Sequence, residues 1–290
     1  MASLITLSRR IKSIRGTRQI TKAMELVSAS KLRRAQEQAQ ASRDYRKAAY
    51  SLLARLNTIR EVEQQPLFRK RSAKTRLYVV ITSNSGLAGA YNANILKLLT
   101  QSITRDKQDG VKSLVATIGN KGVQFVRRLK GVELLAHYSA FGDRPTQNDI
   151  RPILQTLVEQ YRDEKVDEVS VLYTVYRSSI SQEALCLPLL PAQLDGEAES
   201  VPAGLVMNFE PDVETVIDQI ATRLIEVQIW QALLESLASE HSMRMLAMKN
   251  ATDNANELIG DYTLAYNTAR QAAITQELAE ITGGAEALNG

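Results

Sequence analysis

The chain has 290 residues, a net charge of +4 and an apolar fraction of 44%, which is in the range of globular proteins. No run of about 18 apolar residues occurs, so the sequence predicts no membrane-spanning helix. Two histidines and one cysteine exclude an internal disulfide and a zinc cluster. We therefore expect no metal and no cofactor. Cys186 lies in an apolar, strand-like run and is expected to be a small buried side chain.

The start of the chain predicts a long helix over residues 1–60. Residues 3–57 contain no proline and a single glycine, Gly16, which costs about 1 kcal/mol relative to alanine inside a helix. An apolar seam at helical spacing opens this segment, formed by Leu4, Leu7, Ile11 and Ile14. A helix with only one such seam needs a partner on that side.

This first helix has a strongly basic surface. Within residues 1–34 the only acid is Glu25, and the basic residues are Arg9, Arg10, Lys12, Arg15, Arg18, Lys22, Lys31, Arg33 and Arg34. Such a surface binds nucleic acid, an anionic membrane or an acidic protein, or it is simply solvated. A basic DNA-binding helix usually belongs to a zipper or a helix-turn-helix unit, and neither follows here. A membrane-surface helix carries bulky aromatic residues, which residues 1–44 lack. A protein partner is therefore favoured over a nucleic acid or a membrane.

Residues 75–192 predict a central α/β domain, because strand-like and helical segments alternate. We expect strands at 76–83, 112–118, 132–138, 166–176 and 183–190, and helices at 90–105, 120–130 and 150–163. This order implies a mostly parallel sheet with right-handed crossovers. The short connection 177–182 favours an antiparallel hairpin for the last two strands. Asn148 or Asp149 is expected to cap the third helix.

The segment 85–92, SGLAGAYN, follows the first strand and opens a helix. Gly86 and Gly89 resemble a phosphate-binding turn at a helix N-terminus. Asn92, however, occupies the third glycine position of the dinucleotide fingerprint, and no acid ends the second strand. No Walker lysine follows, and His137 has no motif of a Ser–His–acid site around it. A tight turn is therefore preferred over a nucleotide-binding enzyme, and no catalytic residue is predicted.

The end of the chain predicts a second long helix, over residues 209–286. From Val213 to Leu288 there is no proline, and the first glycine is Gly260. Apolar residues recur in alternating steps of three and four, which is typical of a coiled-coil seam. A helix of this length, about 110 Å at 1.5 Å per residue, needs a partner helix or a cavity made by other subunits. The alternative is an ordinary bundle of shorter helices, which would need turn signals that this segment largely lacks.

Together these segments predict a mixed α+β and α/β fold. The terminal helices form a long antiparallel coiled coil, and the middle of the chain forms a Rossmann-like α/β domain. The expected parts are a helix over 1–60, a domain over 75–192 and a helix over 209–286.

Three segments closely resemble the F-type ATP synthase gamma-subunit family of bacteria. They are residues 11–36, IKSIRGTRQITKAMELVSASKLRRAQ, residues 245–255, MLAMKNATDNA, and residues 266–281, YNTARQAAITQELAEI. They lie at the matching ends of the chain, and with the α/β middle the resemblance covers essentially all of it.

The resemblance implies a non-catalytic rotor subunit of the central stalk. In the family, the paired terminal helices lie inside a ring of three alpha and three beta subunits, and the α/β domain contacts the epsilon subunit and the membrane ring of c subunits. Rotation driven by protons or sodium ions couples ion flow to ATP synthesis and regulates ATPase activity. The resemblance implies a peripheral protein at the cytoplasmic face of the cell membrane and no nucleic-acid partner.

The resemblance also implies contacts with the beta subunits near the end of the second helix. Arg270 and Gln271 match a polar pair that hydrogen-bonds to a beta-subunit loop. Thr275, Glu277 and Glu280 match nearby positions in the same segment.

A second set of contacts is implied lower on the helices. Arg244 matches an arginine that faces an acidic beta-subunit loop, Met24 packs near this arginine in the family, and Lys22 belongs to the same region. The family commonly has an acid and an arginine before the Gly-Leu turn, where this chain has Asn84 and Ser85. A charged contact of the α/β domain is therefore expected to be missing.

Overall fold

The computed structural model describes residues 4–56, 65–139, 141–142, 145–192 and 213–289, and their side chains except those of 42–56, 213–214 and 286–289. The helices are α1 (Leu4–Leu56), α2 (Tyr91–Gln108), α3 (Asn120–Val126), α4 (Gln147–Arg162) and α5 (Val213–Asn289). The strands are β1 (Thr75–Ile81), β2 (Lys112–Ile118), β3 (Glu133–Tyr138), β4 (Glu168–Tyr176) and β5 (Gln182–Leu190). The chain forms two compact units, one of residues 1–28 with 245–290 and one of residues 29–244.

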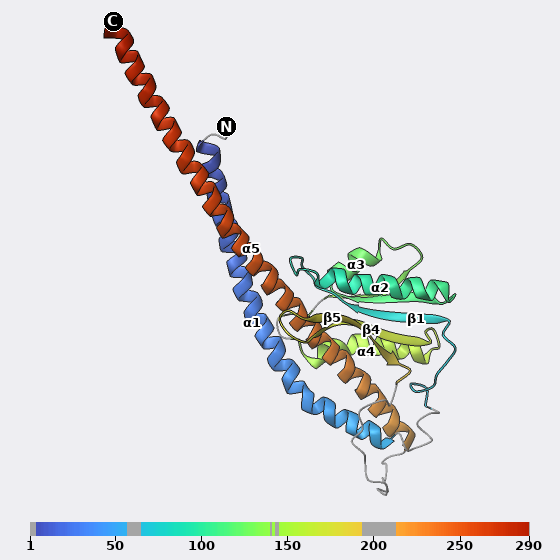
Figure 1. The fold of residues 1–290 in the computed structure, drawn as a ribbon. Coiled ribbons are helices and arrows are strands. Elements are labelled where there is room, and N and C mark those ends of the chain that lie inside the picture. Colours follow the sequence, from blue (N-terminus) through green and yellow to red (C-terminus); the bar gives the residue numbers. More distant parts are fainter. Residues whose placement is uncertain (1–3, 57–64, 140, 143–144, 193–212, 290) are drawn as a thin grey trace. The chain divides into compact units, whose positions relative to one another are not determined.

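The larger unit is built on one five-stranded sheet with the strand order β3-β2-β1-β4-β5 (Figure 1). β1 pairs in parallel with β2 and β4, and β2 pairs in parallel with β3. β5 runs antiparallel to β4, which confirms the predicted hairpin. β1, with the sequence TRLYVVI, is buried over its last five residues, as expected for an apolar strand covered on both faces.

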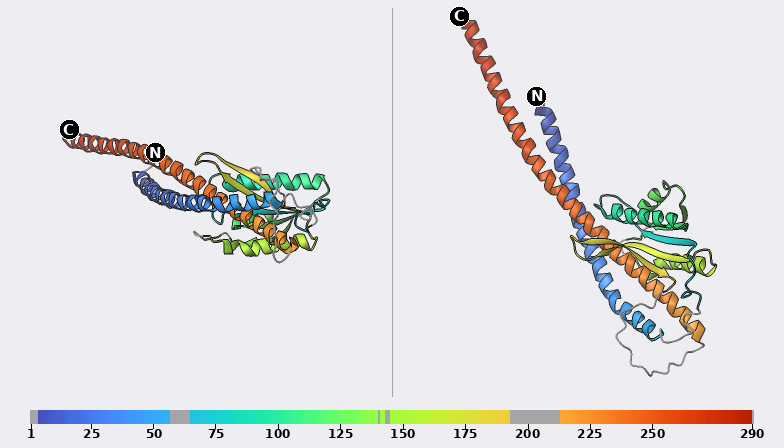
Figure 2. Two further views of the ribbon diagram at one scale, coloured as in Figure 1. Left: turned by 90° about the horizontal axis from the view of Figure 1, so that it is seen from below. Right: turned by 45° about the vertical axis from the view of Figure 1, so that its right-hand side comes forward.

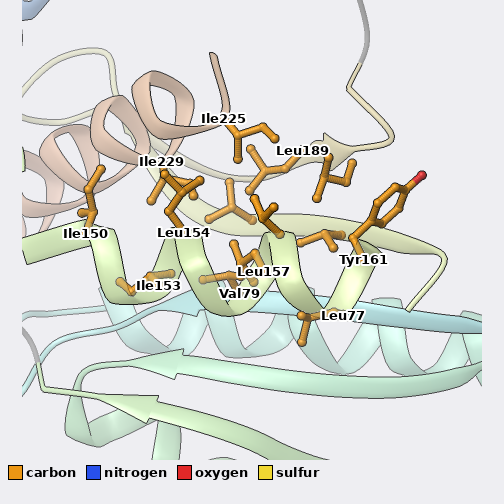
Figure 3. Close-up of a cluster of buried hydrophobic side chains, with 14 of the residues drawn as sticks. Leu77, Val79, Ile150, Ile153, Leu154, Leu157, Tyr161, Leu189, Ile225 and Ile229 are labelled. Carbon is orange, nitrogen blue, oxygen red and sulfur yellow. The ribbon is translucent and has the colours of Figure 1, made fainter. Parts of the chain in front are cut away.

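One face of the sheet is covered by α4 and by the first part of α5. Figure 3 shows Ile153 and Leu157 of α4 close to Val79 of β1, with Ile225 and Ile229 of α5 on the other side of α4. These side chains belong to one large apolar cluster and are 0% exposed. Each buried side chain of this size contributes about 1.5–3 kcal/mol, so this cluster is the main source of the unit's stability.

The opposite face of the sheet is covered by α2 and α3, which Figure 2 shows on the other side of the strands from α4. A smaller apolar cluster forms there from alternate residues of the same strands, such as Tyr78 and Val80, together with Ile95 and Leu99 of α2. Successive side chains of a strand point to opposite faces, so the two clusters share β1 between them.

In the smaller unit, α1 and α5 run antiparallel and side by side (Figures 1 and 2). Arg10 donates to the Tyr262 hydroxyl at 3.2 Å, Arg18 donates to Asn256 at 3.3 Å, and the Thr21 and Thr252 hydroxyls lie 2.8 Å apart. This register places Leu4, the first described residue of α1, near Ala269. The part of α5 beyond that point has no described part of α1 beside it.

The predicted fold class is thus confirmed: the terminal helices pair antiparallel and the middle of the chain is a Rossmann-like α/β domain. The alternative of an ordinary bundle of shorter helices is wrong, because α5 is a single helix. Of the predicted domain boundaries, residues 60 and 209 lie outside the described residues, so the three-part division stays a prediction.

Two local predictions are wrong. The cap of α4 is Thr146, whose backbone N–H donates to the Asp149 carboxylate at 2.7 Å, so Asp149 is the third helical residue rather than the cap. Cys186 is exposed, because it lies on β5, a strand at the edge of the sheet, and lines an open groove. The apolar sequence of this strand indicated that both of its faces would be buried. An edge strand such as β5 is not covered in this way.

Candidate functional site

The carboxyl ends of the parallel strands are where an α/β sheet normally binds ligands, and the turn after β1 lies there. Its glycines do not form a phosphate cradle. The Arg244 guanidinium donates to the Ser85 and Gly86 carbonyl oxygens at 3.5 and 3.4 Å, and to the Ser85 hydroxyl at 3.3 Å. A phosphate needs N–H donors, whereas this turn directs carbonyl oxygens at a cation.

Asn92, at the position of the missing third glycine, stabilises the turn itself. Its side-chain oxygen accepts the Ser83 backbone N–H at 3.1 Å, and its amide donates to the Ser83 hydroxyl at 2.8 Å. These bonds favour the interpretation as a strand-to-helix turn over the nucleotide-binding one.

The crevice between β1 and β4, where the strand order reverses, is occupied by α5. The Ser236 hydroxyl lies 2.9 Å from the Tyr91 hydroxyl and accepts the Thr174 N–H at 3.2 Å. Ser239 donates to the Thr174 carbonyl at 3.1 Å. Both serines are 0% exposed, so the helix binds the end of β4 through satisfied buried polar groups. The chain's own helix thus occupies the position at which other Rossmann-like folds hold a nucleotide.

Arg244 itself is buried, with 8% of the residue exposed. It forms an ion pair of 2.7 Å with Glu240, one helical turn earlier, and lies 3.4 Å from the Nδ1 atom of His241. Burial raises the pKa of the Glu240 carboxyl above its ordinary value, and the charge of Arg244 opposes this rise. We name Glu240, Arg244 and the turn residues Ser85 and Gly86 the Arg244 clasp.

A second buried polar cluster lies between α2 and the sheet, around Asp106. This carboxylate is 0% exposed and accepts from Arg76 at 2.6 Å, from the Tyr78 hydroxyl at 2.8 Å and from Ser113 at 2.8 Å. The hydrogen bonds to Asp106 and then to Glu168 raise the pKa of Arg76, and burial raises the pKa of Tyr78. Each group has a partner, so the cluster ties α2 to the sheet and leaves no free acid or base.

An open groove of about 1060 Å³ lies beside this cluster, lined by α2, β1, β4 and β5. Its walls carry cations and anions together, including Lys97, Arg105, Asp109 and Glu168, with Cys186 on β5. Such a mixed lining selects no single class of ligand.

The predicted beta-subunit contacts near the end of α5 lie together on its exposed stretch. Arg270, Gln271, Thr275, Glu277 and Glu280 are all exposed. The Thr275 hydroxyl donates to the Gln271 carbonyl at 2.9 Å, and Glu280 accepts from a glutamine side chain at 2.9 Å. Arg270 and Gln271 lie where the stretch of paired helices ends.

The second predicted set is divided between the two units. Lys22 is exposed on α1 and bonds to Glu25 at 3.0 Å, and Met24 is half-buried in the same unit. Arg244 belongs to the larger unit and is already engaged in the clasp.

Sequence reasoning missed the polar contacts of α5 and α2. A signal existed for α5, because Ser236, Ser239 and Ser242 recur at steps of three and therefore lie close to one another on the surface of the helix. It also existed for α2, where Asp106 continues the stripe of Tyr91, Ile95 and Leu99, all buried.

In the described part of the chain, no helix is both long and apolar enough to cross a membrane. The fold and the site define a class of protein in which the two terminal helices are long and paired, and the ligand crevice of the α/β unit is filled by the chain's own helix.

Comparison with known proteins identifies the family within this class. The model of the family described as ATP synthase matches residues 3–288. The ATP synthase gamma chain of Geobacter metallireducens is 42% identical over 292 residues, with 100% of both chains covered. That of Polaromonas naphthalenivorans is 39% identical over 280 residues, covering 96% of this chain and 97% of the relative. The chain belongs to the ATP synthase gamma-chain family.

Solved structures share the fold. A chain from the OSCP, F1 and c-ring structure of Euglena gracilis mitochondrial ATP synthase matches with a TM-score of 0.68 and 20% identity, covering 98% of this chain and 94% of that one. A chain from the central-stalk and c-ring structure of Tetrahymena thermophila mitochondrial ATP synthase matches with a TM-score of 0.63 and 24% identity, covering 80% of this chain and 99% of that one.

Proposed function

We propose that the chain is the central-stalk rotor subunit of an F-type ATP synthase, and that it couples proton flow through the membrane motor to ATP synthesis and regulates ATPase activity. The observation that carries the proposal is its relation to gamma chains, at about 40% identity over their full length. The subunit itself is non-catalytic, since its α/β crevice is filled by Ser236 and Ser239 of α5.

The partners proposed are the alpha and beta subunits of the ring, the epsilon subunit and the c-subunit ring. The basic surface of α1 serves protein contacts in this interpretation and not nucleic acid. The location proposed is the cytoplasmic face of the cell membrane, with the chain held peripherally through its partners. The division into a helix over 1–60, a domain over 75–192 and a helix over 209–286 belongs to the same proposal.

The mechanism is a shift of population by unequal contact. An off-axis helix pair touches three chemically identical beta subunits at different faces, so each beta subunit has a different most stable state. Rotation passes these states from one subunit to the next, and the free energy of each contact is the coupling between the shaft and a catalytic site.

Exposed polar residues support this mechanism, on the part of α5 that begins where its pairing with the described part of α1 ends. Arg270 and Gln271 present donors to a beta-subunit loop, and Thr275, Glu277 and Glu280 extend the same surface. Arg244, with Met24 and Lys22, is proposed for the second contact. An arginine can give two parallel hydrogen bonds to a carboxylate, and a contact that must break each turn needs moderate strength.

The test is to isolate the tagged chain from washed native membranes. Recovery of alpha, beta and epsilon subunits with ATPase activity is expected. Recovery of the chain alone, or with nucleic acid that salt removes, would contradict the rotor assignment.

The predicted contact residues are tested in the isolated complex. Arg270→Ala and Gln271→Ala are expected to lower ATP-driven proton pumping several-fold, because each removes donors to the beta loop, with no change in the stability of the chain. Arg128→Ala, which changes an exposed arginine on the α/β unit, is the matched control. Equal pumping in all three variants would remove Arg270 and Gln271 from the contact.

A further inference from the structure

Two successive parts of α5 attach to the sheet in different ways. The part that includes Ile217, Leu224 and Ile229 packs in the large apolar cluster. The part that follows attaches through the buried hydroxyls of Ser236, Ser239 and Ser242, all 0% exposed. Apolar contact is non-directional, whereas hydrogen bonds hold only over a narrow range of distance and angle. The polar part therefore fixes the rotation of α5 about its own axis more strictly than the apolar part does.

The hydroxyl contacts reach two strands of the hairpin. Ser236 and Ser239 bind the backbone of Thr174 on β4. Ser242 accepts from the side chain of Gln182 on β5 at 3.2 Å and donates to the Ser179 carbonyl at 3.2 Å. The helix is thus attached to both strands by groups spaced one turn apart.

The Arg244 clasp ends this polar attachment and reaches the other side of the crevice. The Arg244 guanidinium pairs with the Glu240 carboxylate at 2.7 Å and also donates to the Ser85 and Gly86 carbonyl oxygens. A guanidinium has five donors in a rigid plane, so it can serve the carboxylate and the turn at once, which a lysine cannot do in the same geometry.

The turn that the clasp holds has an unusual backbone. Leu87 has φ +60° although it is not glycine, and 63% of it is exposed. A non-glycine residue with this backbone conformation is strained, and it persists only when its surroundings fix it. Gly89 has φ +54°, and a side chain there would lie 3.6 Å from the Met243 carbonyl of α5. The turn therefore lies directly on α5 beside the clasp.

We propose that the Arg244 clasp is the joint that makes α5 and the sheet rotate as one body. Glu240 orients Arg244, and Arg244 fixes the turn after β1 on the helix, so both are positioning residues that act within the chain. This inference rests on the proposed rotor function. It gives Arg244 a role within the chain, through the turn, in addition to the contact with another subunit proposed above.

The test uses the whole ATP synthase, carrying this chain, in sealed vesicles, with ATP hydrolysis and proton pumping measured on the same sample. Arg244→Gln is expected to lower the protons pumped per ATP about five-fold. The loss should be larger against an imposed pH gradient, because the opposing torque then turns α5 relative to the sheet when the clasp is absent. Arg244→Lys should restore part of the loss. The matched control is Arg162→Gln, which breaks the half-exposed Arg162–Asp218 pair that also links α5 to the unit and should leave the ratio unchanged.

Glu240→Gln separates an internal joint from a contact with another subunit. If Arg244 acts through the clasp, Glu240→Gln also lowers the pumping ratio, and the double variant is no worse than Arg244→Gln, because coupled residues are not additive. A normal ratio in Glu240→Gln beside a low ratio in Arg244→Gln would overturn the inference.

Ser85→Ala provides the readout if Arg244→Gln does not assemble. Ser85 is exposed and its hydroxyl accepts from Arg244, so the substitution weakens the clasp without opening the core. A lowered ratio supports the joint, and an unchanged ratio contradicts it. A wild-type chain that joins no ATPase would instead refute the rotor function.

Discussion

The two compact units treat their apolar side chains differently. In residues 29–244, the apolar side chains of both sheet faces are gathered in two buried clusters. In residues 1–28 with 245–290, many large apolar side chains are exposed: Ile5, Ile20, Leu26, Val27, Leu246, Leu258, Leu264, Ile274, Leu278 and Ile281. The larger unit buries its apolar side chains in its own core. The smaller unit leaves an exposed apolar surface of the kind that other chains cover.

The largest expected effect comes from opening the core of the larger unit. Leu157→Ala removes a side chain that is 0% exposed in the large apolar cluster, and should lower the free energy of unfolding by about 2–5 kcal/mol. Leu278→Ala, at a position 58% exposed, should change it by less than about 0.5 kcal/mol. Urea unfolding of the purified chain, followed by circular dichroism, measures both. Similar losses would mean that the two units do not differ as the burial indicates.

A smaller loss is expected from the buried charge of the same unit. Asp106→Ala leaves Arg76 and Tyr78 without their buried acceptor and should cost about 3 kcal/mol. Asp109→Ala is the control, because this exposed carboxylate lies 4.0 Å from Arg76 and should contribute little. The same unfolding measurement applies, and a harmless Asp106→Ala would show that the cluster does not tie α2 to the sheet.

The paired helices should respond more weakly. Thr252→Val removes the buried hydroxyl pair with Thr21, a loss of about 1 kcal/mol. Amide hydrogen exchange in the paired parts of α1 and α5 should become roughly five-fold faster, since local opening costs less. Thr268→Val, an exposed hydroxyl bonded only within its own helix in the described structure, is the control. Unchanged exchange in Thr252→Val would mean that packing alone holds the pair.

The last expected effect is a dependence on pH. Burial raises the pKa of Glu240 above the ordinary 4.5, so the folded chain binds this proton more readily than the unfolded chain. Its contribution to stability is then complete below pH 4.5 and falls as the pH rises through the raised pKa. The groups facing it are Arg244, Lys31 and the Tyr91 hydroxyl. Glu240→Gln should therefore gain stability relative to the wild type between pH 4.5 and 7 in thermal unfolding, and a constant difference over this range would contradict the raised pKa.

The features of the fold that depend on the periodicity of apolar residues could be predicted from the sequence. The seam of α5 and the absence of proline define a single helix, and the β-branched strand 75–81 with its neighbours defines the parallel sheet. Register between the terminal helices was beyond prediction, because it is set by pairs such as Thr21 with Thr252, which are far apart in sequence. The apolar character of β5 did not reveal that it is an edge strand, since strand order depends on which neighbours it finds.

The candidate site also has a part that could be predicted from the sequence and a part that could not. Arg270 and Gln271 could be named from a segment that resembles a family, and their exposure agrees with a contact surface. The clasp could not be foreseen, because Arg244 and Ser85 meet only once β1 and α5 are folded together. Spacing within one helix shows which residues share a face and not what that face meets.

The position of the one cysteine has a practical consequence. Because Cys186 is the only thiol in the chain and is exposed on β5, a maleimide dye or spin label would attach there alone, with no need to remove other cysteines. Desolvation in the groove that it lines raises the pKa of this thiol. Labelling should therefore be slow at neutral pH and speed up in mildly alkaline buffer, since the thiolate is the reacting species. A reporter on β5 would follow the motion of the sheet while the surfaces of both terminal helices stay unmodified.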